Sequence, residues 1–365
     1  MATLDPHAPI NIQYTSGTTG FPKGATLSHR NILNNGYLTT ATLNFTHTDR
    51  LAIPCRSTTA SGWSWGNLGC TTHGARMVIP APGFDPLVTL QAIQDERCTA
   101  VYGVPTMFIA IQNTPSFADY DLSTLRTGIM AGSPCPVEVM KHCINDMRME
   151  EVSIAYGMTE TSPASTQTRI DDDVDRRTAT IGRVHPHVEI KIVDPATGET
   201  VQRGESGEFC TRGYSVVFGY WNDEEKTKEA IDSDGWMHTG DLAVMREDGY
   251  ATIVGRIKDM VIRGGENIYP HEIEEFLYTH PDVEDVQVVG VPDEKYGEEL
   301  CAWIKLRDGA ADLDTDAVRA FAAGKLAHYK IPRYVLLVDE FPMTVTGKIR
   351  KVEMREESMR RLSLT

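Results

Sequence analysis

The residues that most constrain this chain lie near its start, in the stretch YTSGTTGFPKG at Tyr14–Gly24. Its three glycines allow the backbone to fold tightly and point N–H groups at an anion, while the hydroxyls add donors and Lys23 adds a positive charge. Apolar residues Ile10 and Ile12 predict a strand before the loop, and Ser28 is a candidate N-cap of a helix after it. A strand, such a loop and a helix together predict a phosphate cradle. The spacing is not that of a Walker A loop, and a flexible surface loop is the alternative.

Composition indicates a globular protein with room for two or more domains. The 365 residues are 41% hydrophobic and 24% charged. The 35 Lys and Arg residues against 51 Asp and Glu residues give a net charge of −16, which argues against a nucleic-acid partner. Seven cysteines are scattered singly, which favours reduced, mostly buried thiols in a cytoplasmic protein over disulfides or a zinc site. The absence of an apolar run of ~18 residues predicts no transmembrane segment.

The order of apolar segments predicts the domain organisation. Strand-like and helix-like segments alternate over Ile10–Pro163, which favours a mostly parallel α/β sheet. Asp171–Arg177 reads as a charged linker, and Ile181–Val254 contains short strands separated by turns. Beyond Lys258 the pattern is that of an independent small α+β unit. The predicted division is a large domain at 1–257, with an α/β part at about 1–170 and a β-rich part at 181–257, followed by a small domain at 258–365.

The stretch IAYGMTETSP at Ile154–Pro163 predicts part of a ligand site. An apolar strand ends there in Tyr-Gly, and the loop that follows presents Thr159 and Glu160. Open α/β sheets bind ligands beyond the carboxyl ends of their strands, so this loop is expected to meet the phosphate loop. An aromatic ring can cover a purine, a threonine hydroxyl can donate to a phosphate and a carboxylate can hold Mg²⁺. The alternative is a turn in which Thr and Glu only cap the strand end.

Three later stretches carry candidate polar groups. In GWMHTGD the carboxylate of Asp241 suits two hydroxyl donors, although a lone aspartate there is usually a turn residue. His238 is interpreted as a packing residue, because no nucleophile or metal cluster is recognised beside it. In GRIKDMVIRGGENIYP, Arg256 offers a fixed fork of donors, and the Gly-Gly pair is either a plain turn or a place of close ligand approach. In FPMTVTGKIRK, Lys348 is either a solvated charge or a cation that a preceding glycine allows to reach a site.

Together these five stretches, which run from Tyr14 to Lys351, resemble the adenylate-forming (AMP-binding) enzymes, namely acyl-CoA synthetases, adenylation domains and luciferases. The resemblance implies a large α/β domain with a β-rich subdomain, followed by a small α+β lid. It also implies an AMP-forming acid–thiol ligase that uses ATP, Mg²⁺ and CoA to convert a fatty or medium-chain acid to acyl-AMP and then to acyl-CoA. An aryl-CoA ligase, an adenylation domain and an inactive nucleotide-binding fragment are the alternatives.

The resemblance assigns roles residue by residue. It implies that Lys348 and Lys23 are catalytic cations, that Glu160 is catalytic and binds the metal, and that Lys258 is the hinge before the lid. Gly264 and Gly265 are expected to contact CoA. The residues expected to bind ATP or AMP are Thr15, Ser16, Gly17, Thr18, Thr19, Gly20, Lys23, Gly132, Ser133, Tyr156, Gly157, Thr159, Asp241, Arg256 and Lys348.

Two features depart from the family pattern. The segment RSTTASGWSW at Arg56–Trp65 replaces an aromatic–His pair that typically lines the acyl pocket, and we expect it to leave buried polar groups without partners. Suitable codons for this segment, read two bases later, give VYHCFGMVL, so we hypothesise a short compensated frameshift in the gene or its sequencing. Because the family carries a sizeable portion before the phosphate loop, we also expect an N-terminally truncated member. Its expected partners are small-molecule substrates and, in a homodimer, a second copy.

Overall fold

The computed structural model describes residues 4–15, 22–54, 61–133, 135–310, 313–344 and 349–364. The chain divides into two compact units. The first comprises Met1–Thr239 and Ala243–Ile253, and the second comprises Gly240–Leu242 and Val254–Thr365. The continuous part of the second unit thus begins a few residues before Lys258, and the predicted domain boundary at Lys258 stays a prediction.

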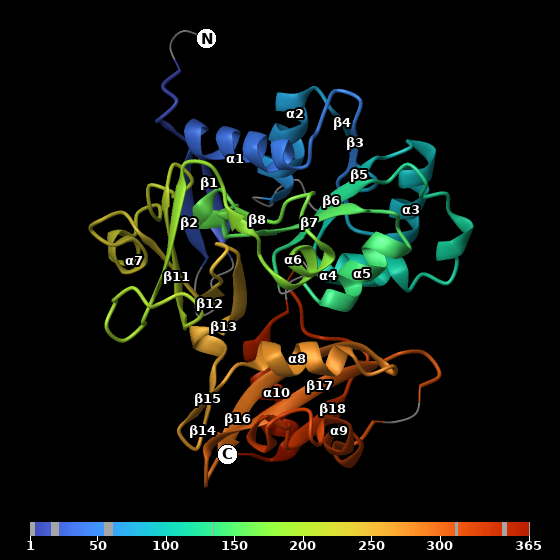
Figure 1. The fold of residues 1–365 in the computed structure, drawn as a ribbon, viewed down its shortest axis with the longest axis vertical. Coiled ribbons are helices and arrows are strands. Elements are labelled where there is room, and N and C mark those ends of the chain that lie inside the picture. The colour runs from blue at the N-terminus through green and yellow to red at the C-terminus, as the bar shows by residue number, and fades with distance from the viewer. Residues whose placement is uncertain are drawn as a thin grey trace. The chain divides into compact units, whose positions relative to one another are not determined.

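A seven-stranded sheet forms the centre of the first unit (Figure 1). Its order is β4-β3-β5-β6-β7-β8-β9; the five strands from β4 to β7 pair in parallel, and β8 and β9 add antiparallel edges. The prediction of a mostly parallel α/β sheet is therefore confirmed. The strands are β3 (Arg50–Ala52), β4 (Arg76–Val78), β5 (Ala100–Gly103), β6 (Thr127–Ala131), β7 (Glu151–Tyr156), β8 (Thr166–Gln167) and β9 (Arg183–Val184).

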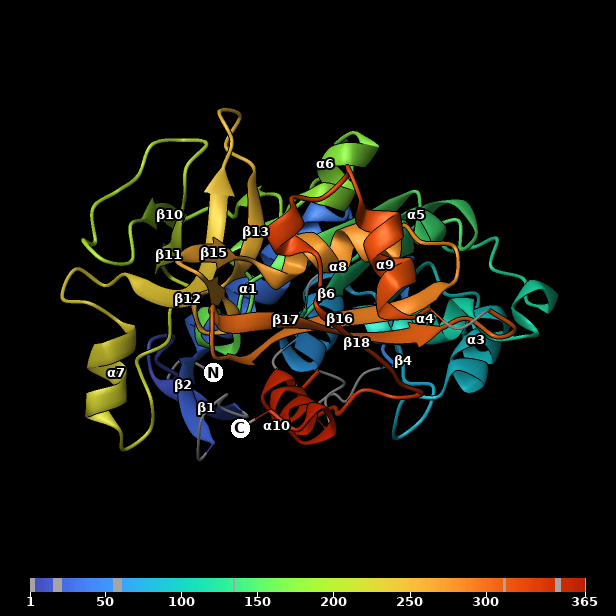
Figure 2. The same cartoon turned by 90° about the horizontal axis from the view of Figure 1, so that it is seen from below.

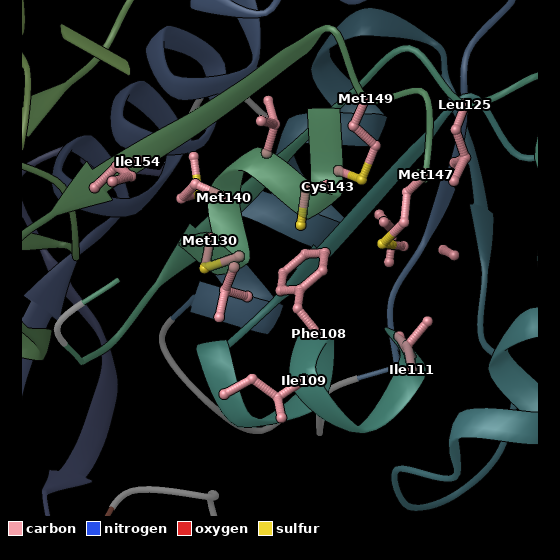
Figure 3. Close-up of a cluster of buried hydrophobic side chains, with 14 of the residues drawn as sticks. Phe108, Ile109, Ile111, Leu125, Met130, Met140, Cys143, Met147, Met149 and Ile154 are labelled. Carbon is pink, nitrogen blue, oxygen red and sulfur yellow. The ribbon is translucent and has the colours of Figure 1, made fainter. Parts of the chain in front are cut away.

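Each face of this sheet packs into its own hydrophobic core, because successive strand residues point to opposite faces. On β5, Val101 belongs to a core that includes Phe108 and Met140, whereas Tyr102 belongs to a core that includes Trp65. Figure 3 shows the first of these cores, where Phe108 lies among methionine and cysteine side chains. The helices are α1 (His29–Thr42), the π-helix η1 (Ser61–Leu68), α2 (Gly69–His73), α3 (Pro86–Asp95), α4 (Pro105–Gln112), η2 (Phe117–Asp119) and α5 (Val137–Asn145).

The start of α1 follows the sequence expectation, but the segment before it does not. Ser28 caps the helix, and its hydroxyl and the Asn31 side chain form a reciprocal capping box. However, β1 (Pro9–Thr15) and β2 (Lys23–Ser28) pair antiparallel as a separate hairpin. The glycine-rich loop therefore joins two hairpin strands, and the helix expected near Ser28 begins at His29, directly after β2. Strand β2, whose last five residues are buried, thus pairs along β1 before the helix begins.

A second sheet, β10-β11-β12-β13, forms the predicted β-rich part. The predicted charged linker is not plain linker, because it contains the start of a helix capped by the Asp173 carboxylate, which accepts from the Arg176 N–H. Arg177 of this helix is buried and donates to the Asp172 carbonyl. The elements are η3 (Thr159–Thr161), α6 (Val174–Ala179), β10 (Val188–Val193), β11 (Ser206–Gly213), α7 (Glu224–Ala230), β12 (Met237–Met245) and β13 (Ala251–Arg256).

The second unit is an α+β structure around the sheet β15-β14-β17-β16, to which β18 adds in parallel beside β17. Figure 2 shows β16, β17 and β18 side by side, with α8 and α9 on one face and α10 on the other. In the described part of the chain, no helix is both long enough and apolar enough to cross a bilayer. The elements are η4 (Ile257–Asp259), β14 (Val261–Arg263), β15 (Glu266–Ile268), α8 (Pro270–Tyr278), β16 (Val283–Asp293), β17 (Gly297–Leu306), α9 (Thr315–Ala322), η5 (His328–Lys330), β18 (Tyr334–Leu337) and α10 (Lys351–Leu362).

Candidate functional site

Two charged residues that the sequence placed in the candidate site, Lys23 and Glu160, both contact Tyr220. The Lys23 ammonium lies 4.8 Å from the centroid of the Tyr220 ring. The Tyr220 hydroxyl donates a hydrogen bond of 2.8 Å to Oε1 of Glu160. The fold therefore brings a cation from the base of the glycine-rich loop and a carboxylate from the loop after β7 to one aromatic side chain.

Backbone pairing fixes Tyr220 in this place. The segment Val217–Trp221 runs antiparallel beside β2, with Thr26 N donating to the Gly219 carbonyl at 2.9 Å. The Val217 N–H donates to the Glu160 carbonyl at 3.1 Å, which attaches the same segment to η3. Tyr220 could not be recognised from the sequence, since one aromatic residue beside a glycine is a weak signal and the pairing with β2 is long-range.

Burial determines the protonation state of the Tyr220 hydroxyl beside Glu160. The Glu160 carboxylate is buried, and burial, followed by the nearby Glu160 charge, raises the pKa of the Tyr220 hydroxyl well above its ordinary value. The phenol therefore stays protonated and acts as a donor that orients the carboxylate. A buried, oriented carboxylate beside a loop expected to hold phosphate fits Mg²⁺, which prefers hard oxygen ligands from one or two carboxylates and the substrate phosphates.

The expected adenine-side residues lie at the carboxyl edge of the central sheet. Ala131 and Ala155 are register partners on β6 and β7, so Gly132 and Tyr156 follow at the same edge. The Tyr156 ring packs edge-on against Phe209, with centroids 5.0 Å apart. Gly157 is required next, because its φ is +158° and a Cβ there would lie 1.9 Å from the Pro163 carbonyl oxygen.

The remaining expected residues of the first unit are placed less completely. Thr159 is half-buried in η3, and Ser133 is exposed after β6. At the base of the glycine-rich loop, the Thr15 hydroxyl donates to the Lys23 carbonyl at 3.4 Å. Ser16, Gly17, Thr18, Thr19 and Gly20 lie outside the described residues, so their assignment stays a prediction.

Asp241 and Arg256, two predicted nucleotide-binding residues of the second unit, form an ion pair. Arg256 Nε lies 2.6 Å from Asp241 Oδ1, and the aspartate is buried whereas the arginine is exposed. The ion pair thus places the Asp241 carboxylate, an acceptor, beside the Arg256 guanidinium, a donor. Lys258 lies exposed in η4, and its role as a hinge stays a prediction.

Gly264 and Gly265 form the two-residue turn of the β14–β15 hairpin. Both have positive φ, +61° and +89°, as a type I′ turn requires. The pair is therefore a hairpin turn, and its expected contact with CoA stays a prediction. Lys348 lies outside the described residues, but Lys351 shortly after it has its ammonium 2.6 Å from the buried carboxylate of Glu274.

The interpretation of His238 rested on a wrong premise. Glu208 and Cys210 lie beside it, and one ligand atom from each of the three residues lies within 4.8 Å of the other two. His238 Nδ1 is 2.8 Å from Glu208 Oε2 and 3.5 Å from Cys210 Sγ. Burial, followed by Glu208, raises the pKa of the Cys210 thiol to about 12. The pairing of β11 with β12 that gathers these residues could not be read from the sequence.

The altered segment is better accommodated than its sequence suggests. Ser64 is buried, and its hydroxyl lies 3.0 Å from the Ile32 carbonyl oxygen and 3.1 Å from that of Ser162. Trp65 Nε1 donates to Asn35 Oδ1 at 3.0 Å. The expectation of unpartnered polar groups is therefore wrong for these two residues, whereas Arg56 to Ala60 lie outside the described residues.

The mostly parallel central sheet, the β-rich part and the small α+β unit define the class of adenylate-forming folds. The chain belongs to the AMP-binding enzyme family: the model of that family matches residues 1–221, and the model of the family's C-terminal domain matches residues 272–348. The resemblance seen in the sequence is thus confirmed.

Two relatives illustrate this membership. YngI of Bacillus subtilis (strain 168), named as a candidate acyl-CoA synthetase, is 55% identical over 100% of this chain and 66% of its own length. The mitochondrial medium-chain acyl-CoA ligase ACSF2 of Danio rerio is 48% identical over 98% of this chain and 59% of its own length. The chain therefore spans less than two thirds of the length of these curated relatives.

Solved structures share the fold. ATP-bound MatB from Rhodopseudomonas palustris superposes with a TM-score of 0.85 at 32% identity, covering 95% of this chain and 67% of MatB. The anthranilate CoA ligase AuaEII, in complex with anthranoyl-AMP, gives a TM-score of 0.89 at 26% identity, covering 98% of this chain and 69% of AuaEII.

Proposed function

We propose that this chain is the nucleotide- and acid-activating part of an AMP-forming acyl-CoA synthetase. In the proposed reaction, a carboxylate attacks the α-phosphate of ATP to give acyl-AMP and pyrophosphate, and the thiol of CoA then attacks the acyl carbon to give acyl-CoA and AMP. The observation that carries the proposal is the meeting of Lys23 and Glu160 at Tyr220, beside the loop expected to hold phosphate. The names of the relatives favour a fatty or medium-chain acid as substrate.

Each candidate site residue is proposed to contact the part of the substrates that its charge or polarity suits. Joining a carboxylate to a phosphate brings two anions together, so Lys23 and Lys348 are proposed to offset the negative charge that builds up at phosphorus. Thr159 is proposed to donate to a phosphate, and Gly132, Ser133, Tyr156 and Gly157 to line the adenine side. Asp241 and Arg256 are proposed to take the ribose hydroxyls and the α-phosphate. Ser16, Gly17, Thr18, Thr19 and Gly20 would surround the phosphates.

Glu160 is the proposed protein ligand for Mg²⁺. Its carboxylate is buried and oriented by Tyr220, which is consistent with a fixed oxygen ligand. When bound there, Mg²⁺ would neutralise phosphate charge and assist departure of pyrophosphate. Within the chain itself, the Tyr220 hydroxyl orients the Glu160 carboxylate, and the Lys23 ammonium lies beside the Tyr220 ring.

The second half-reaction is proposed to depend on the C-terminal domain, at 258–365. Lys258 would be the hinge that separates the adenylating state from the thioester-forming state, and Gly264 and Gly265 would approach the CoA arm. Lys351, shortly after Lys348, has its ammonium 2.6 Å from the buried carboxylate of Glu274. No protein nucleophile is required, because the CoA thiol itself attacks the acyl-adenylate.

The cellular setting is part of the same proposal. The six cysteines among the described residues are free thiols, five of them buried, which supports a reducing compartment such as the cytoplasm. The ACSF2 relatives are named as mitochondrial. The proposed partners are the acid, ATP and CoA, and a homodimer is retained as a prediction.

A pyrophosphate-release assay with a panel of acids tests the proposal. We expect release with ATP, Mg²⁺ and medium-chain fatty acids, and acyl-CoA formation only when CoA is added. Preference for aromatic acids would favour the second candidate, an aryl-CoA ligase, which the likeness to AuaEII supports. ATP·Mg²⁺ binding by calorimetry without turnover of any acid would instead identify a nucleotide-binding fragment.

A further inference from the structure

Three side chains on neighbouring strands of the β-rich sheet have the chemistry and spacing of a metal site. Glu208 and Cys210 are two residues apart on β11, so they project from the same face of the strand. His238 projects from β12, which pairs with β11. Their ligand atoms all lie within 4.8 Å of one another, and no other such group of His, Cys, Asp and Glu is found among the described residues.

The spacing fits a small tetrahedral ion. The Nδ1 of His238 lies 3.5 Å from the Cys210 sulfur and 2.8 Å from Glu208 Oε2. Bonds of ~2.3 Å to sulfur and ~2.0–2.2 Å to nitrogen and oxygen place tetrahedral ligand atoms roughly 3.3–3.7 Å apart. The Cys210–His238 separation therefore fits as it stands, the Glu208–His238 pair would have to open slightly, and the Glu208–Cys210 separation is within 4.8 Å. A thiolate, an imidazole and a carboxylate also match the ligand preferences of Zn²⁺.

A carboxylate lies near the second ring nitrogen of His238, and the three-residue cluster is partly open to solvent. Asp232 Oδ2 lies 3.7 Å from Nε2 of His238, slightly beyond hydrogen-bond distance, whereas Nδ1 is the nitrogen beside Glu208 and Cys210. Metal-bound histidines commonly give their second ring nitrogen to such a carboxylate, which fixes the ring. Cys210 is fully buried and Glu208 is nearly so, whereas the His238 side chain is 31% exposed, so a water molecule can complete the coordination.

The local charge also favours a cation. Glu208, Asp232 and a Cys210 thiolate would supply three negative charges. Lys191, the register partner of Cys210 on β10, supplies one positive charge, and its ammonium is held 4.6 Å from the centroid of the Trp236 ring. The balance remains negative, which suits a divalent ion.

We propose that Glu208, Cys210 and His238 bind one Zn²⁺ ion per chain, with Asp232 as the residue that orients His238. This site is separate from the Mg²⁺ ligand Glu160 and does not depend on the proposed catalytic activity. The ion would also link β11 to β12, since it would take ligands from both strands. Phe209, between the two β11 ligands, packs on Tyr156 and accepts a 2.7 Å hydrogen bond from Thr239, so the linked strands also support a residue expected to bind the nucleotide. The bound ion is expected to stabilise this sheet by mass action.

Metal titration of the full chain, first freed of metal with a chelator, tests the site. With Co²⁺ as a spectroscopic substitute for Zn²⁺, we expect one equivalent to produce thiolate-to-cobalt absorption. Cys210→Ser should abolish that absorption and weaken Zn²⁺ binding by ~100-fold or more, since a soft ligand is lost. Asp232→Asn should keep the absorption and weaken Zn²⁺ binding by ~10–100-fold. The control Cys135→Ser removes a half-buried thiol outside the cluster and should behave like the parent chain.

Thermal unfolding gives a second readout that needs no enzymatic turnover. Zn²⁺ should raise the Tm of the parent chain and of Cys135→Ser, but not that of His238→Gln, whose fold is checked by circular dichroism. The His238 side chain is partly exposed, so this variant is expected to fold even if Cys210→Ser does not. Failure of the parent chain to bind either ion, or retention of the thiolate absorption in Cys210→Ser, would overturn the proposal.

Discussion

The hydroxyl of Tyr220 donates a 2.8 Å hydrogen bond to Glu160, which joins a residue of the segment after β11 to the carboxylate proposed to hold Mg²⁺. Glu160 is buried, so an unpaired oxygen there would be costly, and the phenol supplies a donor where water is scarce. The same ring lies 4.8 Å from the Lys23 ammonium. One aromatic side chain thus supports both charges of the candidate phosphate site.

Removal of the Tyr220 hydroxyl should therefore weaken metal-dependent steps. Hydrogen bonds to charged groups contribute ~1.5–3 kcal/mol, so Tyr220→Phe is expected to lower pyrophosphate release by about tenfold or more at limiting Mg²⁺. The phenylalanine ring keeps the contact with Lys23, and excess Mg²⁺ should restore part of the rate. Leu33→Ala, at an exposed position, is the control and should leave pyrophosphate release unchanged. An unchanged Mg²⁺ dependence in Tyr220→Phe would show that the hydroxyl does not orient Glu160.

Local signals in the sequence predicted local structure well. Ser28 predicted the start of α1, and a turn was one of the two interpretations given to the glycines at 264 and 265. Lys23–Ser28 was not recognised as a strand because KGATLS has few β-branched or aromatic residues, and pairing with β1 determines its conformation. Tyr220 was missed for a related reason: its contacts with Lys23 and Glu160 arise from tertiary structure and leave no spacing to read.

The same limit applies to the cluster around His238. Glu208 and Cys210 belong to one motif-free strand, and His238 belongs to a stretch singled out for Asp241. Only the pairing of β11 with β12 brings the three side chains together. In the altered segment, the partners of the polar groups also come from distant parts of the chain. Asn35 on α1 accepts a hydrogen bond from Trp65, and main-chain carbonyl oxygens lie within hydrogen-bond distance of the Ser64 hydroxyl, which the local sequence does not indicate.

Lys348→Ala should lower acyl-AMP formation by ~10²–10³-fold and leave nucleotide affinity nearly intact. The reason is that its proposed interaction forms mainly as charge develops in the transition state. Pyrophosphate release and calorimetry with ATP·Mg²⁺ separate the two quantities, and Lys325→Ala removes an exposed lysine of the same unit as a control. Equal losses in affinity and turnover would assign Lys348 to ground-state binding instead.

Lys258→Pro should spare acyl-AMP formation and impair transfer to CoA. Proline fixes φ near −65°, which restricts the rotation expected of a hinge, and Lys258 itself is exposed, so few packing contacts are lost. The two half-reactions are measured separately, as pyrophosphate release without CoA and as acyl-CoA formed from supplied acyl-AMP. Lys258→Ala, which leaves φ free, is the matched control. A parallel fall in both half-reactions would contradict the hinge assignment.

His185 gives a prediction about stability that is independent of catalysis. The residue is buried, and neither ring nitrogen has a hydrogen-bond partner among the described residues. Burial, followed by the Arg169 charge, lowers the pKa of His185 from 6.5 to about 3. The folded state therefore excludes a proton that the unfolded chain binds. The resulting stability is complete above pH 6.5 and is lost as the pH falls toward 3.

Between pH 7 and pH 5, this single residue should lower the free energy of unfolding by about 2 kcal/mol. Urea unfolding of the parent chain and of His185→Gln at both pH values measures the effect, and the difference between the two pH values should be smaller in the variant by that amount. The variant His47→Gln removes an exposed histidine and should keep the pH dependence of the parent. If His185→Gln lost as much stability on acidification as the parent chain, His185 would have to take up its proton without unfolding, and the burial of its ring would not control acid stability.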